Sequence, residues 1–251
     1  MTSLRLSLVA LTFALWSAAV PAHSAVFAQF DPDASAADFK WVRSTSPSTG
    51  GDLFSINSTG ATSAQGVATH FTFLDPALSA LAFLPATLTL SASAPSGNPA
   101  VNNGGGIYTK LGVSGGFSFI YSGVSGIVGG HVLVQNVTNL LSGVFTNAWM
   151  QGGGTSGSAN LAATSGSASY TSDIELFTGA KPNSDEFAFN LLDVTPGFGA
   201  TVGKALNSFR ANGGGNFSFL ATPEPAAWGL MLVGFAGLGL ALRARRRTTA
   251  A

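Results

Sequence analysis

The sequence predicts an all-β fold, an antiparallel β-sandwich or jelly-roll-like domain with an apolar segment at each end of the chain. A Phe-x-Phe unit occurs four times, at residues 71–73, 117–119, 187–189 and 217–219. Because side chains alternate between the two faces of a strand, each unit directs two rings to one face. Clusters of Gly, Ser, Asn and Pro separate short alternating runs, which is typical of a sandwich. Together these observations predict at least four strands around a phenylalanine-rich core.

Further alternating runs extend this pattern along the chain, at residues 39–43, 53–57, 66–74, 86–92, 132–137, 144–150, 173–177 and 205–211. Asp75 before Pro76 is typical of a helix N-cap with proline at the first helical position, and predicts one short helix at residues 77–81. The Asn-Gly-Gly-Gly sequence at 212–215 predicts a turn, so that 205–211 and 216–221 would form a terminal hairpin. A parallel β-helix is the alternative, but it needs a repeat of fixed period, and the Phe-x-Phe units are 46, 70 and 30 residues apart.

One stretch of the predicted domain is poor in large side chains. Residues 152–169 are mostly Gly, Ser, Ala and Thr. Such a segment has little apolar surface to bury. We expect it to form a loop or an outer edge strand.

The first 24 residues have the features of a secretory signal peptide. Arg5 supplies a positive charge, residues 6–20 are largely apolar, and small side chains follow. Cleavage before Ala25 would place Ala22 and Ser24 at the positions that signal peptidase reads. We therefore expect residues 1–24 to be removed and the domain at 25–221 to be exported as an ectodomain. An uncleaved N-terminal anchor is the alternative.

The C-terminal region predicts one transmembrane helix. Residues 226–242 form an apolar run of 17 residues, which at 1.5 Å per residue barely crosses a hydrocarbon core of about 30 Å. The basic tail at 243–247 would keep this end in the cytoplasm and leave the domain outside; its cations are Arg243, Arg245, Arg246 and Arg247. Trp228 would lie at the opposite interface. A buried core helix, the alternative, does not account for the arginines.

The order of features in residues 222–247 is informative. Pro223, Glu224 and Pro225 precede the apolar run, and the arginines follow it. This tail resembles the PEP-CTERM sorting signal, in its Trp-containing form, although Gly229 stands where that form often has alanine. The resemblance covers about a tenth of the chain. It implies sorting by an exosortase-like membrane enzyme in bacteria that make extracellular polysaccharide, with a recognition motif formed by Pro223, Glu224, Pro225 and Trp228.

The predicted domain is weakly acidic and lacks cysteine. Residues 25–222 contain six Lys or Arg and ten Asp or Glu, a net charge of −4. The absence of a basic cluster argues against a nucleic-acid partner. The absence of cysteine excludes disulfides, thiolate metal sites and cysteine nucleophiles.

No motif predicts catalysis. Residues 112–116 match a nucleophile elbow, but a β pattern rather than a helix follows. Residues 152–157 match GxGxxG without the preceding strand and following helix of a dinucleotide site. His70 and His131 lack the spacing of metal ligands, and we expect both on the surface. The sequence therefore predicts no catalytic residue, no metal site and no cofactor.

Two weaker features leave further functions open. Acidic side chains could hold Ca²⁺; they are Asp31, Asp33, Asp173, Glu175, Asp185 and Glu186. The last four could instead be the carboxylates of a glycan-acting enzyme. Exposed aromatic rings could stack on sugars; the candidates are Trp41, Trp149, Tyr108, Tyr121 and Tyr170.

These features favour a non-enzymatic protein of the cell envelope or extracellular matrix, with a structural or adhesive role among exopolysaccharides. It would be anchored in the inner membrane until its tail is processed, and then reach the cell surface or matrix. Its partners would be signal peptidase, an exosortase-like enzyme, the membrane and extracellular polysaccharide. The alternative is a carbohydrate-binding module or a glycan-acting enzyme. A third possibility, an ice-binding-type surface protein, comes only from the tail, and the sequence shows no regular threonine array to support it.

Overall fold

The computed structural model of the chain describes residues 24–32, 38–45, 49–154, 157–174, 185–200 and 205–220. These residues form an antiparallel, all-β unit, which confirms the predicted class. Its elements in chain order are β1 (Ser24–Pro32), β2 (Phe39–Arg43), β3 (Gly51–Ser55), β4 (Val67–Phe73), the short 3₁₀ helix η1 (Pro76–Leu81), β5 (Leu84–Ala94), β6 (Val101–Asn102), β7 (Ile107–Tyr121), β8 (Gly126–Val128), β9 (His131–Leu133), β10 (Asn139–Gly153), β11 (Ser158–Thr171), β12 (Asp185–Thr195) and β13 (Phe209–Leu220).

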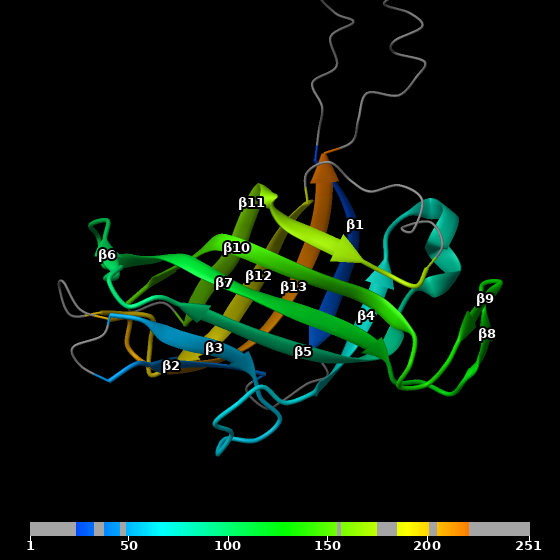
Figure 1. Cartoon of the computed structure of the whole chain (residues 1–251), viewed down its shortest axis with the longest axis horizontal. Helices are drawn as coiled ribbons and strands as arrows, with labels where there is room; N and C mark the ends of the chain where they lie inside the picture. The colour runs from blue at the N-terminus through cyan, green and yellow to red at the C-terminus, as the bar shows by residue number, and fades with distance from the viewer. Residues whose placement is uncertain are drawn as a thin grey trace, which may run out of the picture. The chain divides into compact units, whose positions relative to one another are not determined.

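The main sheet closes on itself into a ring of strands that follow one another along the chain (Figure 1). The six long strands β5, β7, β10, β11, β12 and β13 pair in that order. Two pairs of short strands complete the ring between β13 and β5. One pair is β1 with β4, and the other is β2 with β3. β13 pairs with both β1 and β2, while β5 pairs with both β3 and β4. Every strand of the ring therefore has a neighbour on both sides, which removes free edges.

The ring is flattened into two layers that cross each other (Figure 1). β5, β7 and β10 run across the nearer layer, and β12, β13 and β1 run behind them in a different direction. This sandwich-like form agrees with the predicted class. The layers are nevertheless two parts of one continuous sheet with strands in chain order, whereas a jelly roll is built from two Greek keys.

Phenylalanine rings from both layers fill the space between them. The rings of the Phe-x-Phe units whose side chains are described are buried, as predicted; they are Phe71, Phe73, Phe117, Phe119, Phe187, Phe189 and Phe217. Phe217 on β13 lies at the centre of this cluster. Its ring centroid is 5.2 Å from that of Phe117 in the opposite layer and 5.7 Å from that of Phe189. Closely packed rings of this kind add to the stability gained from burial alone.

The predicted terminal hairpin is wrong, because β13 is one continuous strand. Its Asn-Gly-Gly-Gly stretch at 212–215 continues the ladder to β12 instead of turning. A Cβ atom on Gly215 would lie 2.7 Å from ring carbons of both Phe30 and Phe189. The glycines therefore provide room for core rings, which is the other common reason for glycine inside a strand.

Other predicted elements differ in extent. The Ser- and Gly-rich stretch at 152–169 contains most of β11, which pairs with β10 and β12 and is neither a loop nor an edge strand. The strand predicted at 132–137 ends at Leu133 and is followed by a turn. The predicted short helix is confirmed as η1, and the Asp75 carboxylate accepts a hydrogen bond of 2.8 Å from the Ala77 N–H.

Residues Ala25–Phe219 form one compact unit. None of the helices in the described residues has the length and apolar character needed to cross a membrane. The predicted transmembrane segment at 226–242 and the basic tail lie outside the described residues, as do the first 23 residues. The predicted boundaries of the signal peptide and the sorting tail therefore stay predictions.

Candidate functional site

The predicted sorting motif lies outside the described residues. This is true of Pro223, Glu224, Pro225 and Trp228, of the four arginines, and of Ala22 at the predicted signal-peptidase site. Ser24 and Ala25 are the first two residues of β1. Cleavage between them would remove a single residue from that strand.

The structure gives the described acidic residues separate surroundings. Asp173 follows β11, and its carboxylate accepts a hydrogen bond of 2.7 Å from the Asn139 N–H, which fixes the start of β10. Asp31 is exposed on β1 and lies opposite His70 of β4. Glu186 is half-buried on β12, whereas Asp33 and Glu175 lie outside the described residues. No group of three His, Cys, Asp or Glu side chains suited to a metal ion occurs within the described part of the chain.

Two of the five aromatic candidates belong to the core rather than to a sugar-binding surface. Trp41 is fully buried, and its indole N–H donates to the Leu206 carbonyl at 3.3 Å. Tyr121 is buried as well. The other three candidates are half-buried; they are Tyr108, Trp149 and Tyr170. Aromatic side chains in β domains more often fill or edge the core than face a sugar, and Trp41 and Tyr121 follow that pattern.

The two histidines lie apart, on β4 and β9. Both are half-buried rather than fully exposed. The His70 ring stacks on Phe83 with a centroid distance of 4.4 Å. The residues at 112–116 that match a nucleophile elbow lie inside the long strand β7, so the helix that such an elbow needs does not follow them.

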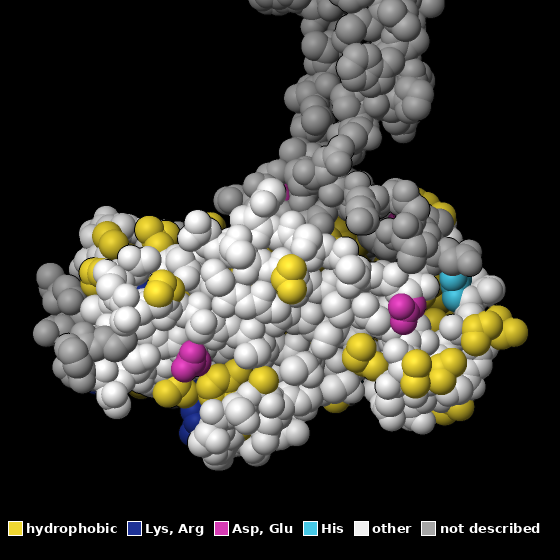
Figure 2. All heavy atoms as spheres, viewed as in Figure 1, with side chains coloured by type: hydrophobic (Ala, Val, Ile, Leu, Met, Phe, Trp, Pro, Cys, Tyr) yellow, Lys and Arg dark blue, Asp and Glu magenta, His cyan; other side chains and the backbone are white. Residues whose placement is uncertain are grey.

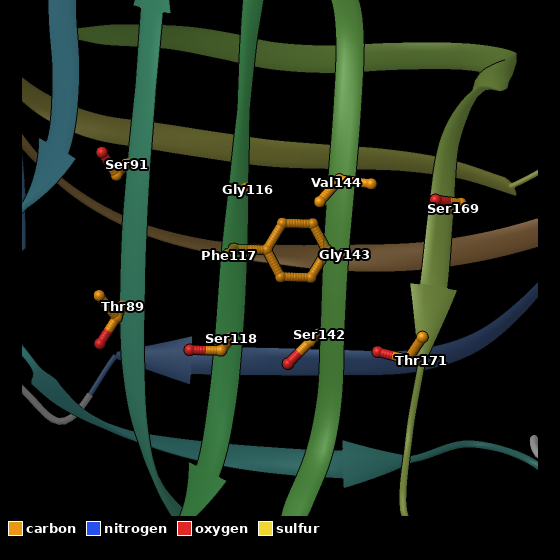
Figure 3. Close-up of a pocket in the computed structure, with 10 residues that line it drawn as sticks. All are labelled: Thr89, Ser91, Gly116, Phe117, Ser118, Ser142, Gly143, Val144, Ser169 and Thr171. Atoms are coloured by element: carbon orange, nitrogen blue, oxygen red, sulfur yellow. The ribbon is translucent and has the colours of Figure 1, made fainter.

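The outer face of the nearer layer carries a shallow hollow of about 350 Å³, which we call the hydroxyl hollow (Figure 3). It crosses β5, β7, β10 and β11, and most of its side chains are small and polar; they are Thr89, Ser91, Gly116, Phe117, Ser118, Ser142, Gly143, Val144, Ser169 and Thr171. Gly116 faces outward without a side chain, which lowers the surface between its neighbours. Figure 2 shows few charged side chains on this face, with apolar side chains scattered over it and more numerous toward its two ends.

Four hydroxyl residues form a straight row in the hydroxyl hollow (Figure 3). Strand register places Thr89 opposite Ser118, Ser118 opposite Ser142, and Ser142 opposite Thr171. Neighbouring strands are about 4.8 Å apart, so the row repeats at that spacing. A hydroxyl both donates and accepts hydrogen bonds, and a row of hydroxyls can therefore bind the hydroxyls of a neutral polymer.

A second hollow, of about 530 Å³, lies on the outer surface of β2, β12 and β13, and we call it the cationic hollow. The buried rings of Trp41 and Phe209 contribute to it. The polar side chains around them are Lys40, Asp193, Thr195, Ser208, Arg210 and Asn212. No local sequence pattern indicates this group, because its members come from β2, which is far in the chain from β12 and β13.

Two buried ionisable groups belong to the framework. Asp38 precedes β2 and is 7% exposed, and its Oδ2 atom has no hydrogen-bond partner. Burial raises the pKa of this carboxyl from 3.8 to about 6, although a hydrogen bond from the Gly213 N–H opposes the change. Lys110 on β7 is fully buried and donates to the carbonyl oxygens of Thr49 and Asn98. Burial lowers the pKa of its ammonium group.

No family model, curated protein or solved structure matches this chain in the comparisons with known proteins.

Proposed function

We propose that this chain is an exported, non-enzymatic protein of the cell envelope or exopolysaccharide matrix, sorted through its C-terminal signal by an exosortase-like enzyme. The observation that carries the proposal is the order of three unlike features within residues 222–247, namely Pro-Glu-Pro, an apolar run and an arginine cluster. A signal peptide at the other end supplies the route to the membrane. Between them lies the β unit, whose role is structural or adhesive.

The position of the strands supports this arrangement. β1 begins at Ser24, the last residue of the predicted signal peptide, and β13 ends at Leu220, two residues before the predicted sorting signal. The ladder between β1 and β4 begins at Ala28, and the ladder between β12 and β13 reaches Phe219. Cleavage before Ala25 and beyond residue 222 would thus leave both ladders intact. The start of β1 and the end of β13 also lie at the same end of the β unit (Figure 1).

The proposal is tested by measuring the intact mass of the native protein from membrane and secreted fractions. We expect the mature form to lack residues 1–24 and the residues beyond the Pro-Glu-Pro motif. Replacing residues 223–225 with alanine should leave in the membrane fraction a form that still contains the arginine cluster at 243–247. The matched control replaces Thr248 and Thr249 with alanine, which leaves the motif unchanged. Normal surface delivery of the motif variant would refute sorting through this signal.

The hydroxyl row favours a second candidate function, a carbohydrate-binding module for a neutral glycan. Thr89→Val with Thr171→Val removes the two outer hydroxyls while preserving side-chain shape. We expect this double variant to lose the retardation that a neutral polysaccharide gel causes, while Thr146→Val, on an exposed part of β10 outside the hollow, should retain it. Equal migration of the double variant and the original chain would exclude the row as the binding surface.

The composition of the hydroxyl row also bears on ice binding. Its inner positions are Ser118 and Ser142, so threonine occurs only at the two ends of the row. An ice-binding surface therefore gains no support from it. Glycan-degrading activity has a separate test, because turnover of a polysaccharide by the purified protein would contradict the non-enzymatic proposal.

A further inference from the structure

We propose that the cationic hollow is a binding site for the carboxylate groups of an acidic polysaccharide. That the ligand is a polysaccharide rests on the matrix role proposed above. The presence of a carboxylate-binding site rests only on the arrangement of residues on β2, β12 and β13. It is tested by binding measurements that do not depend on the sorting signal.

The ring closure brings two cations together. Lys40 on β2 and Arg210 on β13 are 170 positions apart in the chain, yet they are direct partners across the ladder that joins the two strands. Thr195 on β12 is the partner of Arg210 on its other side. Residues directly opposite each other in a sheet have their side chains on the same face, so all three border the hollow.

Neither cation has its charge neutralised by the contacts that hold it. The Lys40 ammonium donates to the Ala61 carbonyl at 2.6 Å, and an Arg210 guanidinium N–H donates to the Thr59 carbonyl at 2.9 Å. A carbonyl oxygen carries no net charge, and each bond uses one donor. An ammonium group has three N–H donors and a guanidinium has five, so donors remain for a ligand. Guanidinium geometry also suits the two oxygens of a carboxylate.

The surrounding side chains suit a sugar. The Ser208 hydroxyl oxygen accepts a hydrogen bond of 2.9 Å from the Arg43 N–H, which leaves its own O–H to donate. Thr195 and Asn212 add a hydroxyl and an amide. A volume of about 530 Å³ lies within the usual range of small-ligand sites, which is about 300–1,000 Å³. The hollow can therefore hold a short segment of a sugar chain.

Asp193 sets the charge selectivity of the hollow. Its carboxylate is exposed at the border and accepts a hydrogen bond of 3.2 Å from the Asn212 amide. The net charge of the hollow is therefore +1 rather than +2. A polymer with one carboxylate per sugar matches this modest charge. Duplex DNA carries one charge per about 1.7 Å and would be repelled by the acidic remainder of the domain.

The experiment measures calorimetric binding of oligogalacturonate to the full chain, purified in a polyoxyethylene detergent that contains no sugar. The matched probe is the methyl ester of the same oligomer, which keeps the sugar rings but removes the negative charge. We expect the acid to bind and the ester to bind at least about tenfold more weakly, as follows from losing charge-assisted hydrogen bonds. Binding of the acid should also weaken as salt is added.

Variants locate the binding to the hollow. Lys40→Gln and Arg210→Gln should each weaken binding about tenfold. Arg43→Gln is the control, because it removes the same charge from a neighbouring residue of β2 that does not line the hollow. Asp193→Asn should strengthen binding several-fold, because it removes a repelling charge. Asn tolerates the left-handed backbone at this position, where φ is 52°. A gain in affinity cannot result from misfolding.

Four results would overturn the inference. Equal affinity for the acid and its ester would exclude carboxylate recognition. A loss of affinity in Arg43→Gln as large as in Lys40→Gln and Arg210→Gln would mean that binding depends only on the net charge of the protein. Equal binding of polyglutamate would indicate an acidic peptide as the ligand class. Unchanged binding with a lower melting temperature in Lys40→Gln and Arg210→Gln would mean that these cations only anchor the loop at 56–66. None of these measurements involves residues 223–225, so failure of the sorting proposal would remain distinguishable.

Discussion

The buried carboxyl of Asp38 provides a direct test of the packing between β2 and β13. We expect Asp38→Asn to make the protein more stable at neutral pH. Asp38 is 7% exposed and its Oδ2 atom has no partner, whereas its other contact, the Gly213 N–H, is one that an asparagine oxygen can keep. The substitution therefore removes a charge that the fold does not compensate.

The expected magnitude follows from the pKa of this group. Burial raises the pKa of Asp38 from 3.8 to about 6. The folded state thus binds the proton more tightly than the unfolded chain, so stability falls as pH rises between these two values. At about 1.36 kcal/mol per pH unit, the charged carboxylate costs about 3 kcal/mol above pH 6. An unsatisfied amide costs about 1–3 kcal/mol, so the net gain from Asp38→Asn near pH 7.5 should reach at most about 2 kcal/mol.

The assay is urea denaturation of the original chain and Asp38→Asn at several pH values between about 3.5 and 7.5. The difference in unfolding free energy should change by about 3 kcal/mol across this range, because only the original chain carries the titrating group. Other carboxyl groups titrate in both proteins and cancel in the comparison. Parallel stability profiles would refute the reasoning, because they would mean that the Asp38 carboxylate is solvated in the folded state.

Three further changes test the core. Gly215→Ala should lower the free energy of unfolding by about 1–3 kcal/mol, because its Cβ would lie 2.7 Å from a ring carbon of Phe30. Gly60→Ala is the control, because a Cβ there would have nothing within 4 Å. Equal urea midpoints for the two variants would contradict the packing around Gly215. Phe217→Ala should cost about 3–5 kcal/mol in the same assay, and a loss below about 1 kcal/mol would argue against a tightly packed cluster. Burial lowers the pKa of Lys110, so the original chain should gain stability relative to Lys110→Met as pH rises toward 10.5; a constant difference would contradict that burial.

Much of the fold could be predicted because its strongest signals are local. The alternation in each Phe-x-Phe unit identifies a strand and its inner face without knowledge of its partners. The glycines of β13 show where such reasoning fails. Glycine permits a turn, but it also permits close approach of another side chain, and only the positions of Phe30 and Phe189 distinguish the two cases. The stretch that contains β11 was predicted as a loop or an edge strand for a similar reason, because small residues form an inner strand when both neighbouring strands supply the pairing.

The candidate surfaces could not be predicted, because both depend on register between strands. The hydroxyl row needs Ser118 to face Ser142, and the cationic hollow needs Lys40 to face Arg210. A shift of one residue in either ladder would move these side chains to the opposite face. Individual serines and lysines carry no signal of their own in a chain that contains many polar residues.

Closure of the ring also determines when the fold can form during synthesis. The last strand, β13, pairs with β1 and β2 near the start of the unit, so the final ladder joins residues separated by nearly the whole domain. Such long-range contacts raise the contact order and slow folding. Until residue 220 has been synthesised, β12 and the paired strands at the start both have exposed edges, and the chain cannot complete its core. The ladders that join β13 to β1 and β2 can therefore form only after the whole unit has been synthesised, so the ring is the last feature of the fold to be completed.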